Sequence, residues 1–142
     1  REFIERKIKE QLLTDGRTLE HGQLLIFEQK VCMETWFLGN RVVFKENPQS
    51  QKLSEFIRYY NVKTDNPELM GNFDEREFAT KAQFHHQYLR DMFRERNIRY
   101  SKNNPREVCS KTYLDRLIER YEDTGHIESF GKWYEFVKNI VK

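Results

Sequence analysis

The sequence contains few of the residues that mark several specialised classes of protein. Its 142 residues include only two cysteines, three prolines and six glycines. Cys32 and Cys109 lie far apart, without the paired spacing of a zinc site or a disulfide framework, so we expect no metal and no cofactor. Two free thiols, acting as small buried hydrophobes, indicate a reducing intracellular compartment, cytoplasm or nucleus. So few prolines and glycines exclude collagen-like and low-complexity chains.

Long hydrophobic runs and a strong net charge are also lacking. No apolar run approaches the roughly 20 residues that cross a bilayer, and no signal-peptide pattern is visible, so we expect no membrane partner. The formal net charge of +2 is too small to indicate a partner by itself. Any electrostatic argument must therefore be local.

What the sequence does contain is typical of a folded domain. Charged residues make up 34% and aromatic residues 14%, a composition that argues against intrinsic disorder. The length permits one domain or two small ones. We expect a single compact domain over residues 1–142, with a possible division into subdomains 1–65 and 72–142. The chain opens inside a charged amphipathic pattern, which suggests a fragment of a longer protein.

Helical periodicity is clear in several places. Apolar residues recur at helical spacing from Phe3 to Leu13, and Gly16 ends that pattern. Asn47-Pro48 predicts the start of a second helix, with the asparagine as its cap. Asn66-Pro67 predicts one short turn through Met70. The strongest pattern predicts a helix from about Asp74 to Asn97, with acidic residues in its first turn, and another runs from Ser110 to Tyr121.

Residues 22–46 allow two interpretations. The first is a set of strands, in which Gln23–Glu28 is one strand and a hairpin turns at Gly39-Asn40. The second is one fully buried helix from Glu20 to Leu38, ended by Gly39. We favour the strands.

The C-terminal third combines a helix, a glycine stop and an aromatic-rich end. The segments Lys111–Leu117, Gly125–Glu128 and Gly131–Tyr134 resemble the winged-helix class of DNA-binding domains. The resemblance implies paired strands around Phe130-Gly131 and a wing that brings Lys132 near phosphate. The chain is therefore expected to be α+β: mainly helical, with about five helices, and with a small antiparallel sheet from residues 23–45 and 126–136.

The basic stretch from Arg90 to Lys111 is the main functional signal. It contains seven cations and three acidic residues, Asp91, Glu95 and Glu107, so its local net charge is about +4. Tyr100 lies among them. Such a patch suits phosphate contacts and base stacking. Thr112 and Arg116 lie on the polar face of the next helix, where they could reach a base or a phosphate. The cations are Arg90, Arg94, Arg96, Arg99, Lys102, Arg106 and Lys111.

These residues predict a non-catalytic nucleic-acid-binding accessory domain of a replication, recombination or transcription protein. The first alternative is a protein–protein interaction domain on the same scaffold. A purely structural interpretation also stays open. In it, the arginines only stabilise the negative C-terminal end of the helix and pair with nearby acidic residues.

A third hypothesis is a metal-dependent nuclease of the PD-(D/E)xK kind, built on Asp15, Glu28 and Lys30. Two carboxylates would converge on Mg²⁺ and the lysine would orient water. ExK is common by chance in so charged a chain, so we expect no nuclease activity. His85 and His86 are adjacent on a helix and cannot chelate one metal as an i, i+4 pair would; we expect His85 to be buried and hydrogen-bonded.

Overall fold

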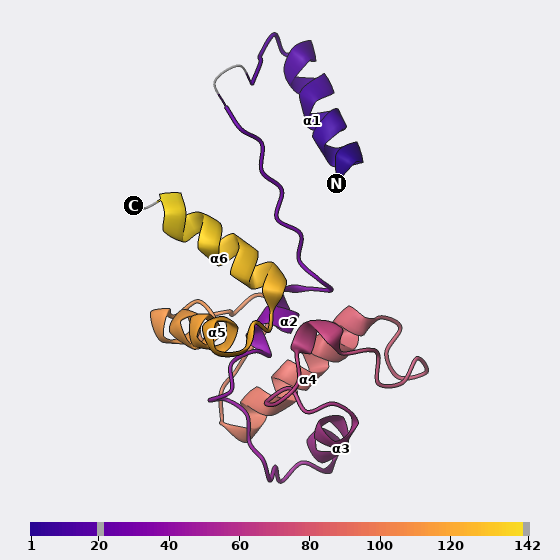
Figure 1. The fold of residues 1–142 in the computed structure, drawn as a ribbon. Coiled ribbons are helices and arrows are strands. Elements are labelled where there is room, and N and C mark those ends of the chain that lie inside the picture. The colour runs from indigo at the N-terminus through magenta and orange to yellow at the C-terminus, as the bar shows by residue number, and fades with distance from the viewer. Residues whose placement is uncertain (20–21, 141–142) are drawn as a thin grey trace.

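The computed structural model describes residues 1–19 and 22–140, and within these ranges the chain is helical without a strand. Residues 15–19 and 22–32, which lie between α1 and α2, have no regular structure, and Figure 1 shows α1 standing apart from the other helices. The elements are α1 (Glu2–Thr14), α2 (Met33–Phe37), α3 (Gln51–Tyr59), the 3₁₀ turn η1 (Pro67–Leu69), α4 (Lys81–Glu95), α5 (Lys111–Thr124) and α6 (Glu128–Ile140).

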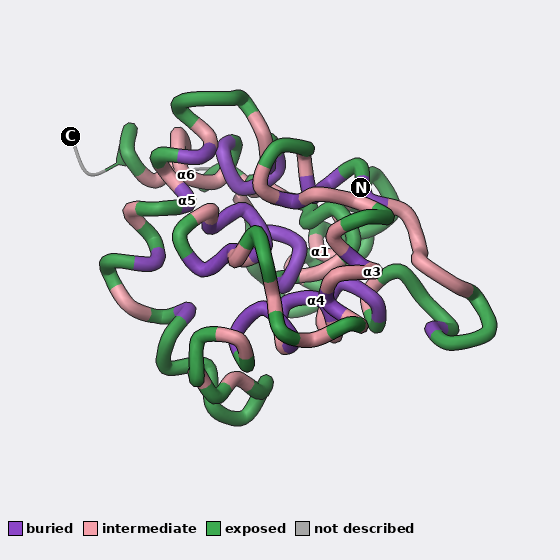
Figure 2. Tube along the Cα trace, turned by 90° about the horizontal axis from the view of Figure 1, so that it is seen from below, coloured by how far each residue is buried: buried purple, intermediate pink, exposed green. Residues whose placement is uncertain are grey.

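The core forms around α4, which packs on α2 and α3, while α5 packs on α6. Aromatic side chains dominate it because so many are available. The Phe56 ring lies 5.1 Å from that of Phe84 and 5.6 Å from that of Tyr88. Edge-to-face and tilted pairs of this kind add stability beyond area burial. Figure 2 shows the buried segments gathered in the interior, with exposed turns around them.

Side-chain caps fix where the helices begin. The side chains of Ser50, Asn66, Thr80 and Ser110 each accept a hydrogen bond from a backbone N–H in the first turn that follows. The short turn after Asn66 and the helix after Ser110 were therefore predicted correctly. The starts at Asn47 and Asp74 were wrong, because a capping hydroxyl lies further along the chain in both cases.

The predicted strands in residues 22–46 are wrong. Within 22–46 the only regular element is α2, and Gly39-Asn40 is not a hairpin: Gly39 N–H donates to Trp36 O at 2.9 Å and extends the turn that ends α2. The single long helix is wrong as well, except that residues 20–21 lie outside the described ranges. Trp36, Leu38, Val43 and Phe44 are buried in the core. This segment is rich in apolar residues because its irregular backbone runs along the core. Neither the strand periodicity nor the helical periodicity describes such a backbone.

The winged helix and the antiparallel sheet are also wrong, and the fold is not α+β. Residues 128–140 form α6, so Gly131 lies inside a helix and not in a turn. A Cβ at Gly131 would lie 2.1 Å from Tyr121 Cε2, so glycine is what allows α6 to pack closely on α5. The glycine between aromatic residues therefore reflects close helix packing and not a turn between strands.

A buried arginine joins α5 to the loop before η1. Arg120 is 1% exposed, and its guanidinium donates to Val62 O, Lys63 O and Asp65 O at 2.6–3.1 Å. Burial lowers the pKa of Arg120 to about 10, and the nearby charge of Arg41 adds to the effect. The buried side chains of α5 are Tyr113, Leu117 and Arg120. Leu114 is left at the surface.

Candidate interaction surfaces

The cations of the basic stretch do not act as one group. Arg96 is exposed but lies against the loop after α2: its Nη2 donates to Phe44 O at 2.7 Å, which holds that loop against the end of α4. Arg94 pairs with Asp91 at 2.8 Å, and Lys111 pairs with Asp115 at 2.7 Å. No ion pair within 1–19 and 22–140 involves the other four, Arg90, Arg99, Lys102 and Arg106.

The remaining site residues lie on α5 and α6. Arg116 pairs with Glu119 on the same exposed face of α5 at 2.8 Å, and Thr112 is exposed beside them. Lys132 pairs with Glu128 at 2.9 Å. Because Lys132 lies in α6, there is no wing to carry it toward phosphate. The structure thus leaves the loop between α4 and α5 as the part of the predicted surface with unpaired cations.

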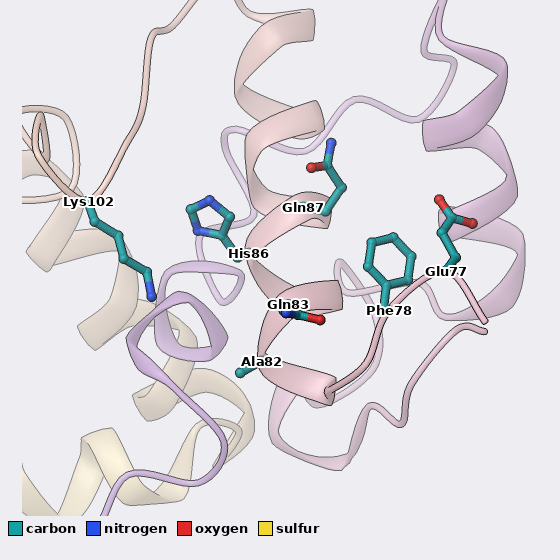
Figure 3. A pocket seen from close by; sticks show the side chains of 7 residues that line it. All are labelled: Glu77, Phe78, Ala82, Gln83, His86, Gln87 and Lys102. Carbon is teal, nitrogen blue, oxygen red and sulfur yellow. The ribbon is translucent and has the colours of Figure 1, made fainter. Parts of the chain in front are cut away.

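A polar pocket of about 540 Å³ lies beside this loop (Figure 3). Figure 3 shows His86 and Lys102 on one side of α4, and Glu77 and Phe78 on the other. His86 contacts the carboxylate of Glu34, a residue that is only 3% exposed. The lining offers a base and a cation without a hydroxyl or thiol nucleophile, an arrangement that suits contact with a ligand better than covalent catalysis. The full lining is Glu77, Phe78, Ala82, Gln83, His86, Gln87 and Lys102.

Glu34 ties three parts of the chain together. Its Oε1 is 3.0 Å from His86 Nδ1 and accepts a hydrogen bond from Tyr100 Oη at 3.1 Å. Burial alone would raise the pKa of Glu34, but the hydrogen bond to His86 and other donors bring that pKa below its usual value. Burial, with the charge of Glu34, raises the pKa of Tyr100. Since the carboxylate is satisfied by α4 and by the following loop, its first role is to fix α2 in place.

An apolar groove of about 430 Å³ lies between α2, α5 and α6. Both tryptophans of the chain line it, and its exposed rim includes Phe27, Met33 and Leu114, each between 36% and 39% exposed. The other lining residues are Gln29, Phe37, Val108, Leu117 and Phe130. The groove thus leaves apolar side chains in contact with water.

The floor of the groove is held by buried polar contacts. Trp36 Nε1 donates to Ser129 Oγ at 2.7 Å, and Ser129 Oγ in turn donates to the buried carboxylate of Glu68. Glu68 also accepts from Ser129 N–H at 3.0 Å at the start of α6, where the helix dipole favours a negative charge. Lys30 Nζ lies 3.7 Å from Glu68 Oε2. The groove is therefore preformed by fixed side chains.

Further exposed apolar residues lie on the N-terminal part of the chain. Leu25 and Val31 lie on the segment that leads to α2, and Phe3, Ile4 and Leu13 lie on α1, which has no buried residue. The large apolar residues exposed elsewhere in the described ranges are Val42, Tyr59, Leu69 and Ile140. Five of the exposed large apolar side chains thus lie at the groove or on the segment that leads to α2: Leu25, Phe27, Val31, Met33 and Leu114.

The residues of the nuclease hypothesis are used differently. Asp15 is the C-cap of α1, Glu28 is exposed on a segment without a strand, and Lys30 Nζ lies 3.6 Å from Glu128. Within the described ranges, no group of three or more His, Cys, Asp or Glu side chains could hold a metal ion. None of the described helices is long and apolar enough to cross a membrane.

Histidine and cysteine predictions had mixed outcomes. His85 is confirmed as a buried, hydrogen-bonded residue, with Nδ1 2.8 Å from Thr35 Oγ1 and Nε2 3.2 Å from Met70 O. Cys109 is exposed and Cys32 half-buried, so the prediction of two buried thiols is wrong. The pairing of Glu34 with His86 was missed, because 52 residues separate them and no spacing rule relates α2 to α4.

Comparison with known proteins gives no relative: no family model, curated protein or solved structure matches this chain. The residues and their geometry are therefore the basis for any function.

Proposed function

We propose that this chain is a protein-interaction domain that binds apolar side chains of another polypeptide in the groove between α2, α5 and α6. The observation that supports the proposal is the groove itself: about 430 Å³, with Trp36 and Trp133 in its lining and apolar residues on its rim. Tryptophans in desolvated pockets are the residues that most often dominate binding energy at protein interfaces.

The groove also meets the requirement of preorganisation. Trp36 is held by Ser129, and Ser129 is held by the buried Glu68, so little side-chain freedom is lost when a partner binds. Leu114 lies at the rim on α5, where an apolar side chain without a partner would contact water. A helix in a groove is the mode of recognition that such a surface fits best.

The test is photo-crosslinking from the groove. A benzophenone amino acid at position 114 is expected to crosslink the chain to a discrete protein, either a second copy or another component of the cell of origin. The matched control carries the same group at Thr112, which is two residues away and so points about 200° from position 114 around α5. Equal labelling from both positions, or none from position 114, would refute the proposal.

A specific observation favours nucleic acid as the second candidate function. Arg99, Lys102 and Arg106 are exposed on the loop between α4 and α5, and none of them joins an ion pair in the described ranges. Arginines at the end of a helix could be explained by local pairing with acidic side chains. That explanation does not apply to these three cations, because they form no such pair. Three phosphate contacts would give a log–log salt slope of about −3 with duplex DNA, since each phosphate adds about 0.9.

Fluorescence anisotropy with labelled duplex and single-stranded oligonucleotides tests this candidate. Replacing Arg99, Lys102 and Arg106 by alanine together is expected to remove nearly the whole slope. Arg116→Ala is the control, because Arg116 is already paired with Glu119. No binding at about 50 mM salt, where electrostatic affinity is strong, would reject the nucleic-acid function.

A further inference from the structure

The polar pocket beside the loop between α4 and α5 is separate from the groove. Its lining comes from the turn before α4, from the first two turns of α4 and from the loop that follows α4 (Figure 3). The pocket and the groove have no lining residue in common. A ligand of the pocket can therefore be tested without reference to the partner of the groove.

The charged groups of the pocket lining are unequally satisfied. The carboxylate of Glu77 pairs with Lys52, with Oε2 and Nζ 2.5 Å apart. The ammonium group of Lys102 has no ion pair and no hydrogen bond within residues 1–19 and 22–140. An ammonium group carries three hydrogen-bond donors and attracts an oxyanion as a point charge. Because the acid of the lining is paired and the base is not, the pocket favours an anionic ligand.

His86 contributes a ring nitrogen whose direction is fixed by a buried acid. Its Nδ1 lies 3.0 Å from Oε1 of Glu34, and the side chain of Glu34 is 4% exposed. Burial acts to raise the pKa of Glu34, but the hydrogen bond from His86 and other donors bring that pKa below its usual value. The carboxylate is therefore ionised near neutral pH, and Nδ1 donates to it. Nε2 is left without a hydrogen bond in the described part of the chain.

The free Nε2 narrows the class of anion. In a neutral ring with its proton on Nδ1, Nε2 accepts a hydrogen bond, and in a charged ring it donates one. A phosphate monoester also keeps one ionisable proton near neutral pH. One shared proton therefore joins Nε2 to a phosphate oxygen, whichever of the two groups holds it. A sulfate ester, a carboxylate or a phosphodiester has no such proton near neutral pH, so each of these needs a charged ring.

The rest of the pocket fits an organic group attached to the phosphate. The volume of about 540 Å³ lies within the range of small-molecule sites and exceeds what a phosphate group alone occupies. Phe78 and Ala82 supply apolar surface in the lining. Figure 3 shows Phe78 on the other side of α4 from Lys102, so a ligand that contacts both lies across the first turns of the helix. The start of α4 also favours a negative charge through the helix dipole.

We propose that this pocket binds a phosphate monoester, with Lys102 Nζ on its charged oxygens, Nε2 of His86 on the oxygen that shares the proton, and the organic group directed toward Phe78. A free nucleotide and the phosphorylated end of a nucleic-acid strand both carry this group. The interior phosphates of a strand are diesters and are not ligands of the pocket.

The first experiment titrates the purified, isotope-labelled full chain with phenyl phosphate near neutral pH, followed by two-dimensional NMR. Phenyl sulfate is the matched probe, because it has the same ring without an ionisable proton. Phenyl phosphate is expected to shift the backbone signals of Ala82, Gln83 and His86. It is also expected to bind roughly tenfold more tightly than phenyl sulfate, which is the value of one hydrogen bond to a charged group. No shift at these residues in the millimolar range, or equal binding of the two probes, overturns the proposal.

Substitutions test each contact separately. Lys102→Ala is expected to weaken phenyl phosphate by roughly tenfold. Arg106→Ala is the matched control, because Arg106 is an exposed cation of the same loop outside the lining, and it should bind like the unchanged chain. His86→Gln, which keeps a donor for Glu34, is expected to remove most of the preference for phosphate over sulfate. Far-UV circular dichroism checks folding. Binding that ignores Lys102→Ala, or a preference that survives His86→Gln, contradicts the assignment.

Two further probes identify the source of the ester. Adenosine 5′-monophosphate represents a free nucleotide, and a short single strand with a 5′-phosphate represents a strand end. Whichever of these binds more tightly identifies the source and supports the monoester assignment. The same strand with a 5′-hydroxyl is the control, and equal shifts from it would show recognition of diesters and overturn the proposal. Crosslinking from position 114, which is not in the pocket lining, tests the proposed function of the groove whatever the pocket binds.

Discussion

Replacing Gly131 by alanine is expected to destabilise the protein through one side chain, Tyr121. The added Cβ would lie 2.1 Å from Tyr121 Cε2 and 2.4 Å from Cδ2 and Cζ, where ordinary contact is 3.4–4 Å. Overpacking of this kind costs about 3 kcal/mol at the upper end of its range. Alanine in a helix interior recovers about 1 kcal/mol relative to glycine. The net loss in the free energy of unfolding is therefore about 2 kcal/mol.

The same substitution in a Tyr121→Ala background is expected to stabilise the protein by about 1 kcal/mol, because the clash is gone and the helix propensity remains. The coupling between the two positions is then about 3 kcal/mol, measured by a double-mutant cycle of urea unfolding followed by far-UV circular dichroism. Gly125→Ala is the control. Gly125 has φ +68° with no atom near its Cβ position, so its cost should be the same in both backgrounds. Gly131→Ala that stabilises both backgrounds equally would show that the close packing of α6 on α5 is wrong.

Two further outcomes are expected. Burial lowers the pKa of His85 from 6.5 to about 4, so its contribution to stability is complete above pH 6.5 and is lost as pH falls toward 4. The difference corresponds to about 3 kcal/mol at most. Urea unfolding at a series of pH values measures it, and a free energy that stays constant over this window would contradict the assignment; His85→Gln should remove most of the dependence. Arg96→Ala should cost about 1–3 kcal/mol because it leaves Phe44 O without its donor, whereas Arg106→Ala should change stability by less than about 0.5 kcal/mol. Thermal unfolding of both variants tests the contrast, and equal effects would contradict it.

Local chemistry made part of this protein predictable from its sequence. A helix from Ser110, a short turn from Asn66 and a buried His85 were all correct, since a capping oxygen or an apolar spacing acts within a few residues. The stop at Gly125 was correct for the same reason, because the residue adopts a left-handed φ of 68° that glycine allows without strain.

For the candidate basic surface, the sequence predicted which cations are present but not which contacts they make. Sequence spacing places Arg96 and Arg99 three residues apart, but it does not tell which one donates to the backbone of the loop after α2. Arg96 reaches three carbonyl oxygens of residues 42–44, contacts that exist only once that loop lies against α4. The pairs of Arg94 with Asp91 and of Lys111 with Asp115 follow local i, i+3 and i, i+4 spacing, which the sequence does contain.

The sequence by itself determined the starts after Asn66 and Ser110, the stop at Gly125, the amphipathic pattern of α1 and the supply of aromatic side chains. The tertiary structure decided that Gly131 lies within a helix, that Arg120 and Glu34 are buried, and that Trp36, Leu114 and Trp133 form one groove. The physical reason is range. Capping and helical periodicity are interactions between near neighbours, whereas burial and close packing depend on segments such as α2 and α6, which lie about ninety residues apart in sequence and meet through Trp36 and Ser129.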